Sequence, residues 1–407
     1  MNPWRGLGGL PREVWFLCLA ILVNRAGTMV LPFLTLYLTL NQKLSAGTAG
    51  LALTVYGIAS IIVAPLAGRL SDRVGGLRII KLSLVLTGII LFIFPFVQSL
   101  TGILAITGLW AVTNEAFRPP SMSIIGDLAG PAQRKAAFAL NRLAINLGMS
   151  IGPVVGGFLA VHSFKLLFYV DGATALVAGT LLALLPWRTT RQAKQTLESS
   201  DLRAVPEAAP ALPYSSVLKD RRFLYFLAAM IPVEILFFQP LAAMPLFLVR
   251  DLHMTEAGYG ALLAINSVII ILVEVPLNSA MANWSHRNAL ALGALLVGTG
   301  FGALVLVNGV VGAAITVVIW TFGEMILLPA SAAYVADIAP AAQSGAYMGL
   351  YTMGFSVALA VGPWLGTQVL EHFGSSALWI GAFFCGCITV VMSWYLRPGK
   401  EPDPSPA

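Results

Sequence analysis

The segment GMSIGPVVGG, residues 148–157, returns 210 positions later as ALAVGPWLGT, residues 358–367. Both copies keep a glycine–proline pair, with another glycine four positions after the first, and both lie in long apolar runs. Residues that precede the segment recur at nearly the same spacing of 209 to 211 positions: Pro65 as Pro276, Glu115 as Glu324, Pro120 as Pro329, Asp127 as Asp337 and Gln133 as Gln343. A repeat of this length predicts two homologous halves.

The composition predicts that both halves lie in a membrane. Of the 407 residues, 58% are hydrophobic and only 10% are charged, whereas soluble domains carry about 25% charged residues. Each apolar run of about 20 residues can cross a bilayer once, and its backbone must then be helical to satisfy its own hydrogen bonds. We identify twelve such runs, at residues 13–40, 46–70, 77–98, 101–128, 134–161, 165–186, 221–250, 256–281, 288–308, 310–338, 342–370 and 376–396.

The predicted fold class is an all-α integral membrane protein with twelve transmembrane helices in two pseudo-symmetric six-helix bundles. The bundles occupy residues 1–187 and 221–397. A cytoplasmic linker, residues 188–220, and a cytoplasmic tail, residues 398–407, are rich in charged residues and proline. We interpret the linker as a passive tether. Many secondary transporters consist of two repeated halves in one bilayer, and their binding site lies between the two halves.

The distribution of lysine and arginine predicts the orientation in the membrane. Loops on one side hold 18 of these residues and loops on the other hold 3, which places both termini in the cytoplasm. The net charge of +6 therefore reflects topology, and no basic cluster with interleaved aromatic residues predicts nucleic-acid binding. We expect no cleavable signal peptide, because the first apolar run is long, is followed directly by a second and lacks a small-residue cleavage site. We also expect no disulfide and no metal site, because the three cysteines fall inside predicted helices, and no cofactor.

Residues 68–76, GRLSDRVGG, stand between the second and third predicted helices. They resemble the signature loop of the major facilitator superfamily, G-x-L-x-D-R-x-G-R, except at Gly76, where the family usually has a basic residue. The resemblance implies a conformational latch in which Gly68 allows close helix approach, Asp72 faces a helix N-terminus, and Arg73 or Arg78 pairs with Asp127. The alternative is a charge cluster that serves topology only.

The fifth predicted helix carries small residues four apart, a pattern that lets helices pack closely. In this position the motif resembles that of the drug:proton antiporter branch with twelve helices, which implies export, and the alternative is generic packing. One arginine that many of these antiporters have in helix four is missing from residues 107–109. The motif residues are Gly148, Gly152, Pro153, Gly156 and Gly157.

Ionisable groups at bilayer depth cost at least about 2.5–3.5 kcal/mol each, so they are candidates for function. We count seven: Arg25, Glu115, Arg118, Arg142, Glu234, Glu274 and Glu324. In the family fold, helices one, four, seven and ten line the central cavity. The resemblance therefore places Arg25, Glu115, Arg118, Glu234 and Glu324 along it.

Proton coupling requires a carboxylate whose proton affinity differs between the two access states. Glu324 is the first candidate because its own helix has no basic residue within two turns, and a packing role is its alternative. Glu115 and Glu234 are the other candidates, although Glu115 could instead form an intrahelical ion pair with Arg118. Arg25, Arg118, Arg142 and Glu274 are assigned to the substrate cavity.

Aromatic residues on the four cavity helices would suit lipophilic cations. These residues are Tyr37, Trp110, Phe117, Phe237, Phe238 and Trp320. The sequence thus predicts a proton-coupled exporter of amphiphilic compounds in a bacterial inner membrane, functional as a monomer and dependent on small substrates, protons and lipid. The alternatives are an exporter or flippase of one metabolite or lipid, and a membrane sensor or scaffold without transport. An enzyme is not expected, since no nucleotide-binding loop or nucleophile motif is found.

Overall fold

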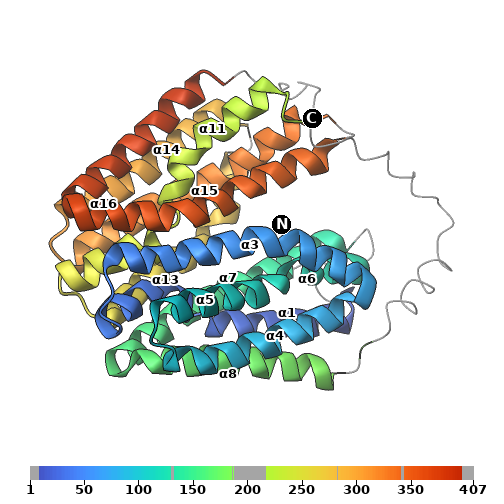
Figure 1. Ribbon diagram of the computed structural model, residues 1–407. Coiled ribbons are helices and arrows are strands. Elements are labelled where there is room, and N and C mark those ends of the chain that lie inside the picture. The colour runs from blue at the N-terminus through green and yellow to red at the C-terminus, as the bar shows by residue number, and fades with distance from the viewer. Residues whose placement is uncertain are drawn as a thin grey trace. The chain divides into compact units, whose positions relative to one another are not determined.

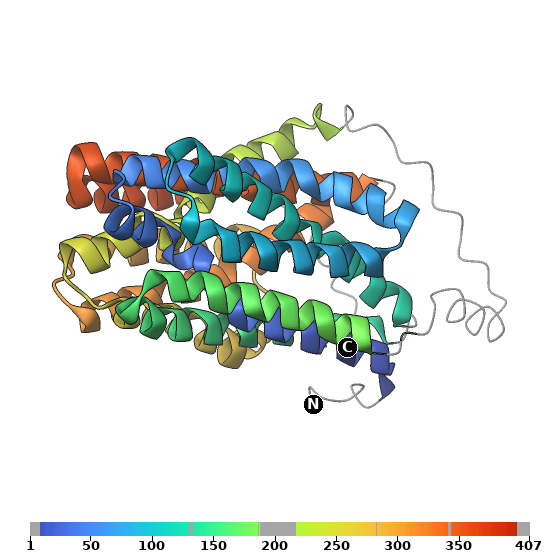
Figure 2. The same ribbon diagram turned by 60° about the horizontal axis from the view of Figure 1, so that its bottom comes forward.

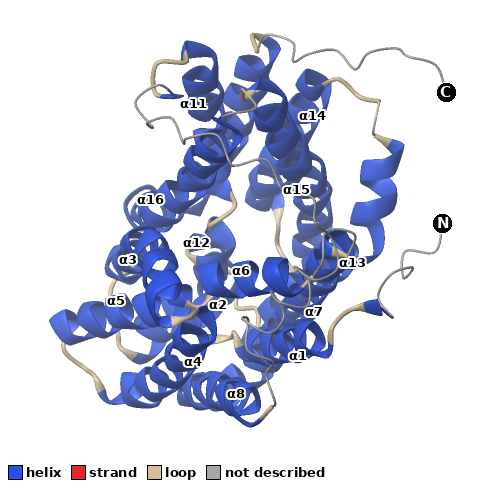
Figure 3. Cartoon of the chain, turned by 90° about the vertical axis from the view of Figure 1, so that its right-hand side faces the viewer, coloured by secondary structure: helices blue, strands red, loops and turns tan. Residues whose placement is uncertain are grey.

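The computed structural model describes residues 9–129, 133–185, 187, 217–281, 283–340 and 343–396, without the side chains of Ala64, Asp72 and Lys135. Every regular element in these ranges is a helix, and no strand occurs among them (Figure 3). The all-α prediction is therefore confirmed. The expected linker and tail lie largely outside the described residues, and the bundle boundaries stay a prediction.

The first half of the chain forms helices α1 (Arg12–Gly27), α2 (Val30–Leu36), α3 (Ala46–Val74), α4 (Gly76–Ile93), α5 (Leu100–Ala116), α6 (Arg118–Leu128), α7 (Arg134–His162) and α8 (Phe164–Leu184). The second half forms α11 (Arg221–Leu236), α12 (Ala243–Pro245), α13 (Glu256–Ala280), α14 (His286–Gly302), α15 (Val310–Ile338) and α16 (Ser344–Trp394). Some of these helices join end to end to make a single span, as α1 does with α2.

Eleven continuous segments within the described ranges are long and apolar enough to cross a membrane. The longest, α16, has 51 residues and contains Gly374 with φ 83°, a left-handed conformation that breaks the helix. At 1.5 Å per residue, a straight helix of that length would be about 76 Å long, more than twice the roughly 30 Å hydrocarbon core. Residues before and after Gly374 therefore make two spans, as expected, which brings the number to twelve.

Large apolar side chains remain exposed on the outer faces of these helices. Val275 on α13 is 72% exposed, and Phe373 on α16 is 75% exposed. Apolar surface on this scale is unfavourable in water, whereas lipid chains cover it without cost. The protein is a multi-pass membrane protein.

The sequence repeat is visible in the backbone. The first span of each half is interrupted, between α1 and α2 and again after α11. Both spans end in a π-helical turn, Tyr37–Asn41 and Leu246–Asp251. Lys43 and His253, 210 positions apart, both have positive φ, at 58° and 55°. Non-glycine residues seldom adopt this conformation, so its recurrence shows that the two halves share local structure as well as sequence.

The chain divides into two compact units that exchange short segments. Unit 1 comprises Met1–Leu44, Leu51–Pro206 and Thr255–Ser267, and unit 2 comprises Ser45–Gly50, Glu207–Met254 and Val268–Ala407. Inside unit 1, α4 packs beside α8 and α1 beside α7 (Figure 1), and α8 also runs along α1 (Figure 2). Inside unit 2, α14 packs against α15 and α16 (Figure 1).

The exchanged segments are the first turns of α3 and α13. In unit 2, the backbone N–H of Gly47 donates to Glu371 of α16. In unit 1, the hydroxyl of Tyr259 donates to the carbonyl of Pro32 at 3.2 Å, and its ring packs edge-on to Phe33. Each unit therefore includes the start of one helix from the other half of the sequence.

Candidate functional site

The helix-five glycines of α7 face the interruption between α1 and α2. A Cβ added at Gly148 would lie 2.5 Å from the Cβ of Arg25, and one at Gly152 would lie 2.9 Å from the carbonyl of Thr28. A Cβ at Gly156 would lie 2.8 Å from the Cβ of Met29. Real Cβ atoms do not approach this closely, so the three glycines let α7 lie directly against the broken part of helix one.

The remaining motif residues face a different neighbour. A Cβ at Gly157 would lie 2.8 Å from the Cα of Ala257 in the first turn of α13, and Gly260 lies against the carbonyl of Pro153. The motif therefore packs one face of α7 on α1 and another on α13. The geometry thus shows the close helix packing that the spacing of the small residues in α7 predicted.

The break in helix one is held by a residue of α8. The backbone N–H groups of Met29 and Val30 both donate to one carboxylate oxygen of Asp171, each at 3.2 Å. Asp171 is 5% exposed. It was not among the seven charged residues identified from the sequence. The signal that could have found it was present, because Asp171 lies inside the apolar run 165–186 like the others.

Glu115 on α5 has a partner that the sequence did not suggest. The hydroxyl of Tyr56 on α3 donates to Glu115 Oε1 at 2.9 Å, and Asn114 Nδ2 donates to the same hydroxyl at 2.7 Å. The expected alternative, an ion pair with Arg118, is not formed between these two described side chains. Glu115 therefore belongs to a three-residue polar cluster that spans α3 and α5.

Glu234 on α11 is the most deeply buried of the predicted carboxylates, with 3% exposure. Its oxygen lies 3.1 Å from where a Cβ on Gly354 of α16 would stand, so the glycine leaves room for the carboxylate. Among the described residues, no hydrogen bond or ion pair of the Glu234 carboxylate is found. Glu274 on α13 is also buried, whereas Glu324 on α15 is half-buried.

The three predicted arginines differ in exposure. Arg25 is half-buried in the last turn of α1, next to Gly148. Arg118, the first residue of α6, and Arg142 on α7 are exposed. Burial therefore distinguishes Arg25 from the other two.

Four of the six predicted cavity aromatics are buried, three of them in unit 1 and Trp320 in unit 2. The ring of Tyr37 lies 4.7 Å from Phe168, and Trp110 packs 5.0 Å from Tyr56. Phe117 is part of the apolar core of unit 1, and Trp320 stacks 5.3 Å from Phe301. These four rings are packed against neighbouring side chains in this structure, and their assignment to the substrate cavity stays a prediction. Phe237 and Phe238 remain partly exposed.

The signature loop is only partly as expected. A left-handed Gly75, φ 95°, joins α3 to α4, which explains a glycine there. The close helix approach expected at Gly68 is not seen, because an added Cβ would meet no described atom within 4 Å. Arg73, Arg78 and Asp127 are exposed, and no ion pair joins them among the described side chains. The side chain of Asp72 lies outside the described residues, so the latch stays a prediction.

The second half has an acid–base pair at the corresponding place. His286, 210 positions after Gly76, lies 2.6 Å from Asp337, the repeat of Asp127. The pair joins the start of α14 to the end of α15. The basic residue missing from the first signature loop is therefore present in the second copy.

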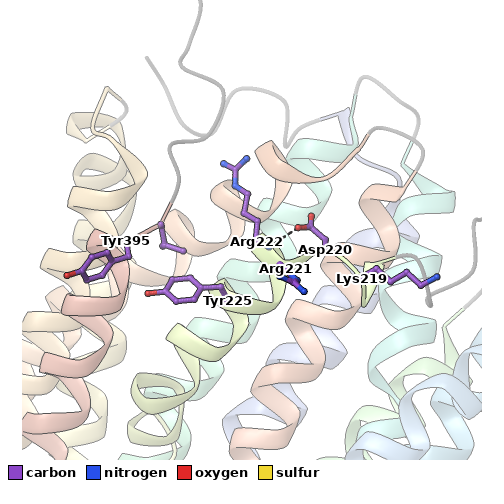
Figure 4. A pocket seen from close by; sticks show the side chains of 7 residues that line it. Lys219, Asp220, Arg221, Arg222, Tyr225 and Tyr395 are labelled. Atoms are coloured by element: carbon purple, nitrogen blue, oxygen red, sulfur yellow. Dashed lines mark hydrogen bonds between the residues drawn. The ribbon is translucent and has the colours of Figure 1, made fainter.

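A pocket of about 500 Å³ opens in unit 2 at the start of α11 (Figure 4). It is lined by Lys219, Asp220, Arg221, Arg222, Tyr225, Tyr395 and Leu396. Asp220 caps α11 by accepting hydrogen bonds from the backbone N–H groups of Arg222 and Phe223. The charged side chains in Figure 4 point in different directions, and the pocket contains none of the predicted site residues.

Comparison with protein families gives one match, which covers nearly the whole chain. The family described as Major Facilitator Superfamily matches residues 17–247 and 235–407. A similar fold occurs in a solved structure of the nucleoside transporter NupG, with a TM-score of 0.79 over 95% of this chain and 99% of that one. The two sequences are 13% identical, so this likeness concerns the fold alone.

Three curated relatives are similar in sequence. The chain is 23% identical over 382 residues to the uncharacterized MFS-type transporter YqjV of Bacillus subtilis, covering 92% of this chain and 90% of YqjV. It is 25% identical over 399 residues to a Na⁺, Li⁺, K⁺/H⁺ antiporter of Planococcus maritimus, covering 89% and 90%. It is 27% identical over 173 residues to the quinolone resistance protein NorA of Staphylococcus aureus, covering 42% and 44%.

Proposed function

This chain belongs to the Major Facilitator Superfamily, and on that basis we propose that it is a proton-coupled antiporter that exports amphiphilic compounds. A transporter of this superfamily moves its substrate through a site that opens alternately to the two sides of the membrane. The coupling ion and the class of substrate are the parts that this proposal adds. A bacterial inner membrane, with both termini in the cytoplasm and a monomer as the working unit, belongs to the same proposal.

The observation that carries the proposal is the environment of Glu234. A carboxylate with 3% exposure inside a membrane helix, and without a partner among the described residues, is costly to keep ionised. Such a group changes its protonation when its surroundings change. We assign proton binding first to Glu234, with Glu115 and Glu324 as further coupling residues and Asp127 with Arg73 or Arg78 as the latch.

The substrate class is supported by the aromatic rings near Glu234. Phe237 follows Glu234 by one turn, is partly exposed, and lies 6.5 Å from the ring of Phe355. Aromatic faces next to a carboxylate attract lipophilic cations. The resistance protein NorA, whose name refers to quinolones, is similar to part of this chain. Arg25 and Arg142 would then hold anionic groups of a substrate or adjust the carboxylates.

A second candidate is exchange of monovalent metal cations for protons. It is favoured by the Planococcus antiporter, which is similar to this chain over 89% of its length, compared with 42% for NorA. Buried carboxylates also suit this function, since their oxygen atoms are ligands that hard cations prefer. Here Glu234 and Glu274 would bind the cation and the proton in turn.

The experiment that separates the two uses inside-out proteoliposomes with an acidic interior. Accumulation of ethidium, a lipophilic cation, that is driven by the pH gradient and lost in Glu234→Gln would support drug export. Dissipation of the gradient by added NaCl or KCl, without ethidium transport, would instead support the cation antiporter. Failure of ethidium, Na⁺ and K⁺ alike would count against both and return the search to a single metabolite or lipid, or to a sensor. Glu13→Gln, on the first turn of α1, is the control for loss of one carboxylate.

A further inference from the structure

Asp171 is a residue of α8 that contacts the break between α1 and α2. The backbone N–H groups of Met29 and Val30 stand where a helix starts, so they have no acceptor in their own segment. Both donate to the same Asp171 oxygen, across 142 and 141 residues of sequence. A single buried carboxyl group therefore accepts from both backbone donors that the break leaves without an acceptor in their own helix.

The surrounding packing brings this carboxylate to its place. The Cα of Gly27, the last residue of α1, lies against Thr174 so closely that an added Cβ would overlap its hydroxyl. That hydroxyl in turn donates to the backbone carbonyl of Asp171 at 2.8 Å. Glycine at position 27 thus allows α8 to contact the end of α1 through Thr174. Thr174 lies about one turn after Asp171, on the same face of α8. The contact is local, direct and confined to unit 1.

The corresponding break of the second half is bonded differently. The position 210 residues after Met29 is Gln239, whose side-chain N–H donates to the carbonyls of Ile235 at 3.1 Å and Gly362 at 3.0 Å. The position 210 residues after Asp171 is Gly381, which has no side chain. The carboxyl group that accepts from the first break is therefore not repeated at the equivalent position of the second half.

We infer that Asp171 is a positioning residue, which holds helix one broken after Gly27 and thereby fixes where the Arg25 side chain stands. Arg25 lies in the last turn of α1, two residues before the break, and its Cβ rests against Gly148. Arg25 and Asp171 both belong to unit 1 and lie on the two helices that meet at the break. The inference rests on the proposed function only for the role of Arg25 in binding substrate.

Hydrogen exchange of the purified protein in lipid nanodiscs tests the structural step without transport. In Asp171→Ala, the amides of Met29 and Val30 should exchange at least tenfold faster than in the wild type, since both lose their acceptor. Asp171→Asn keeps a neutral acceptor and should give a smaller increase. Glu13→Gln, which removes a carboxylate from the other end of α1, should leave both amides unchanged. Exchange within twofold of the wild type in both Asp171 variants would overturn the inference.

Ethidium transport in proteoliposomes tests whether Asp171 acts through Arg25. A positioning role predicts that Asp171→Asn raises KM severalfold with a smaller change in kcat, and that adding it to Arg25→Gln has no further effect. Independent, multiplying effects of the two substitutions would overturn the link to Arg25. If the wild type transports no ethidium, the proposed function fails, while the exchange experiment still decides whether Asp171 holds the break.

Discussion

The two interrupted helices of this protein solve one problem with different chemistry. In the first half, the carboxylate of Asp171 reaches in from α8 and accepts two backbone N–H groups. In the second half, Gln239 lies in the break itself and donates to two backbone carbonyls. The repeat has thus kept the backbone interruption, but the side chain at the first break bonds backbone donors and the side chain at the second bonds backbone acceptors. Where the two copies differ in charge, the difference is the better guide to function, because the shared features are explained by folding alone.

The largest expected effect concerns how closely α7 approaches the first break. Gly148→Val places a branched side chain where even a Cβ would lie 2.5 Å from the Cβ of Arg25. Overpacking of this kind costs about 3 kcal/mol, so the free energy of unfolding, measured by SDS titration in mixed micelles, should fall by that amount. Gly381→Val is the matched control, because a Cβ there meets no described atom within 4 Å. Equal losses in the two variants would mean that α7 is not in close contact with the break.

The next effect tests the neutral break of the second half. Gln239→Leu removes the two hydrogen bonds that its amide donates to the carbonyls of Ile235 and Gly362, and at about 1 kcal/mol for each bond the loss should be about 2 kcal/mol. The same unfolding measurement should show this loss. Gln133→Leu removes an exposed amide that also donates to a carbonyl, that of Gly9, and should change stability by less than about 0.5 kcal/mol. A similarly small loss in Gln239→Leu would show that the second break does not depend on its amide.

A smaller effect is expected at the polar cluster of the first half. Tyr56→Phe removes the hydroxyl that donates to Glu115 and accepts from Asn114, and one buried hydrogen-bonded group contributes about 1 kcal/mol. We expect this loss of unfolding free energy, together with slower coupled transport, since Glu115 loses the hydroxyl that donates to it. Tyr395→Phe, at an exposed ring, should match the wild type in both assays. Unchanged transport in Tyr56→Phe would remove Glu115 from the proposed coupling residues.

The sequence predicted the parts of this structure that depend on periodic apolar residues. Twelve spans, two halves and the close packing of the helix-five glycines followed from run length and small-residue spacing. Side-chain partners did not follow, because they join residues far apart in the chain, as Tyr56 and Glu115 do. The ring contacts of Tyr37 and Trp110 did not follow for the same reason, since helix number alone does not say which face of a helix a ring occupies. Asp171 was overlooked although its position in an apolar run was visible.

The smallest expected effect would transfer the acid–base pair of the second half into the first. His286 pairs with Asp337 at 2.6 Å, whereas their repeats are Gly76 and Asp127. Gly76→Arg should let a guanidinium reach Asp127, since the Cβ would meet only side-chain atoms of Ser71 and Ile124, at 3.0 Å and 3.2 Å. An exposed pair is worth at most about 1 kcal/mol, so unfolding should show a slight gain that disappears in Gly76→Arg combined with Asp127→Asn.

High salt should weaken that gain, because exposed charges are screened. His286→Ala should lose a similar, small amount in the second half. A gain in stability that survives Asp127→Asn would mean that the new arginine bonds a group other than Asp127. The site of Gly76 and Asp127 would then not be equivalent to the site of His286 and Asp337. If instead the gain depends on Asp127 and transport slows, the added pair stabilises one access state over the other. The first half would then change between access states more readily because it lacks an ion pair equivalent to His286–Asp337.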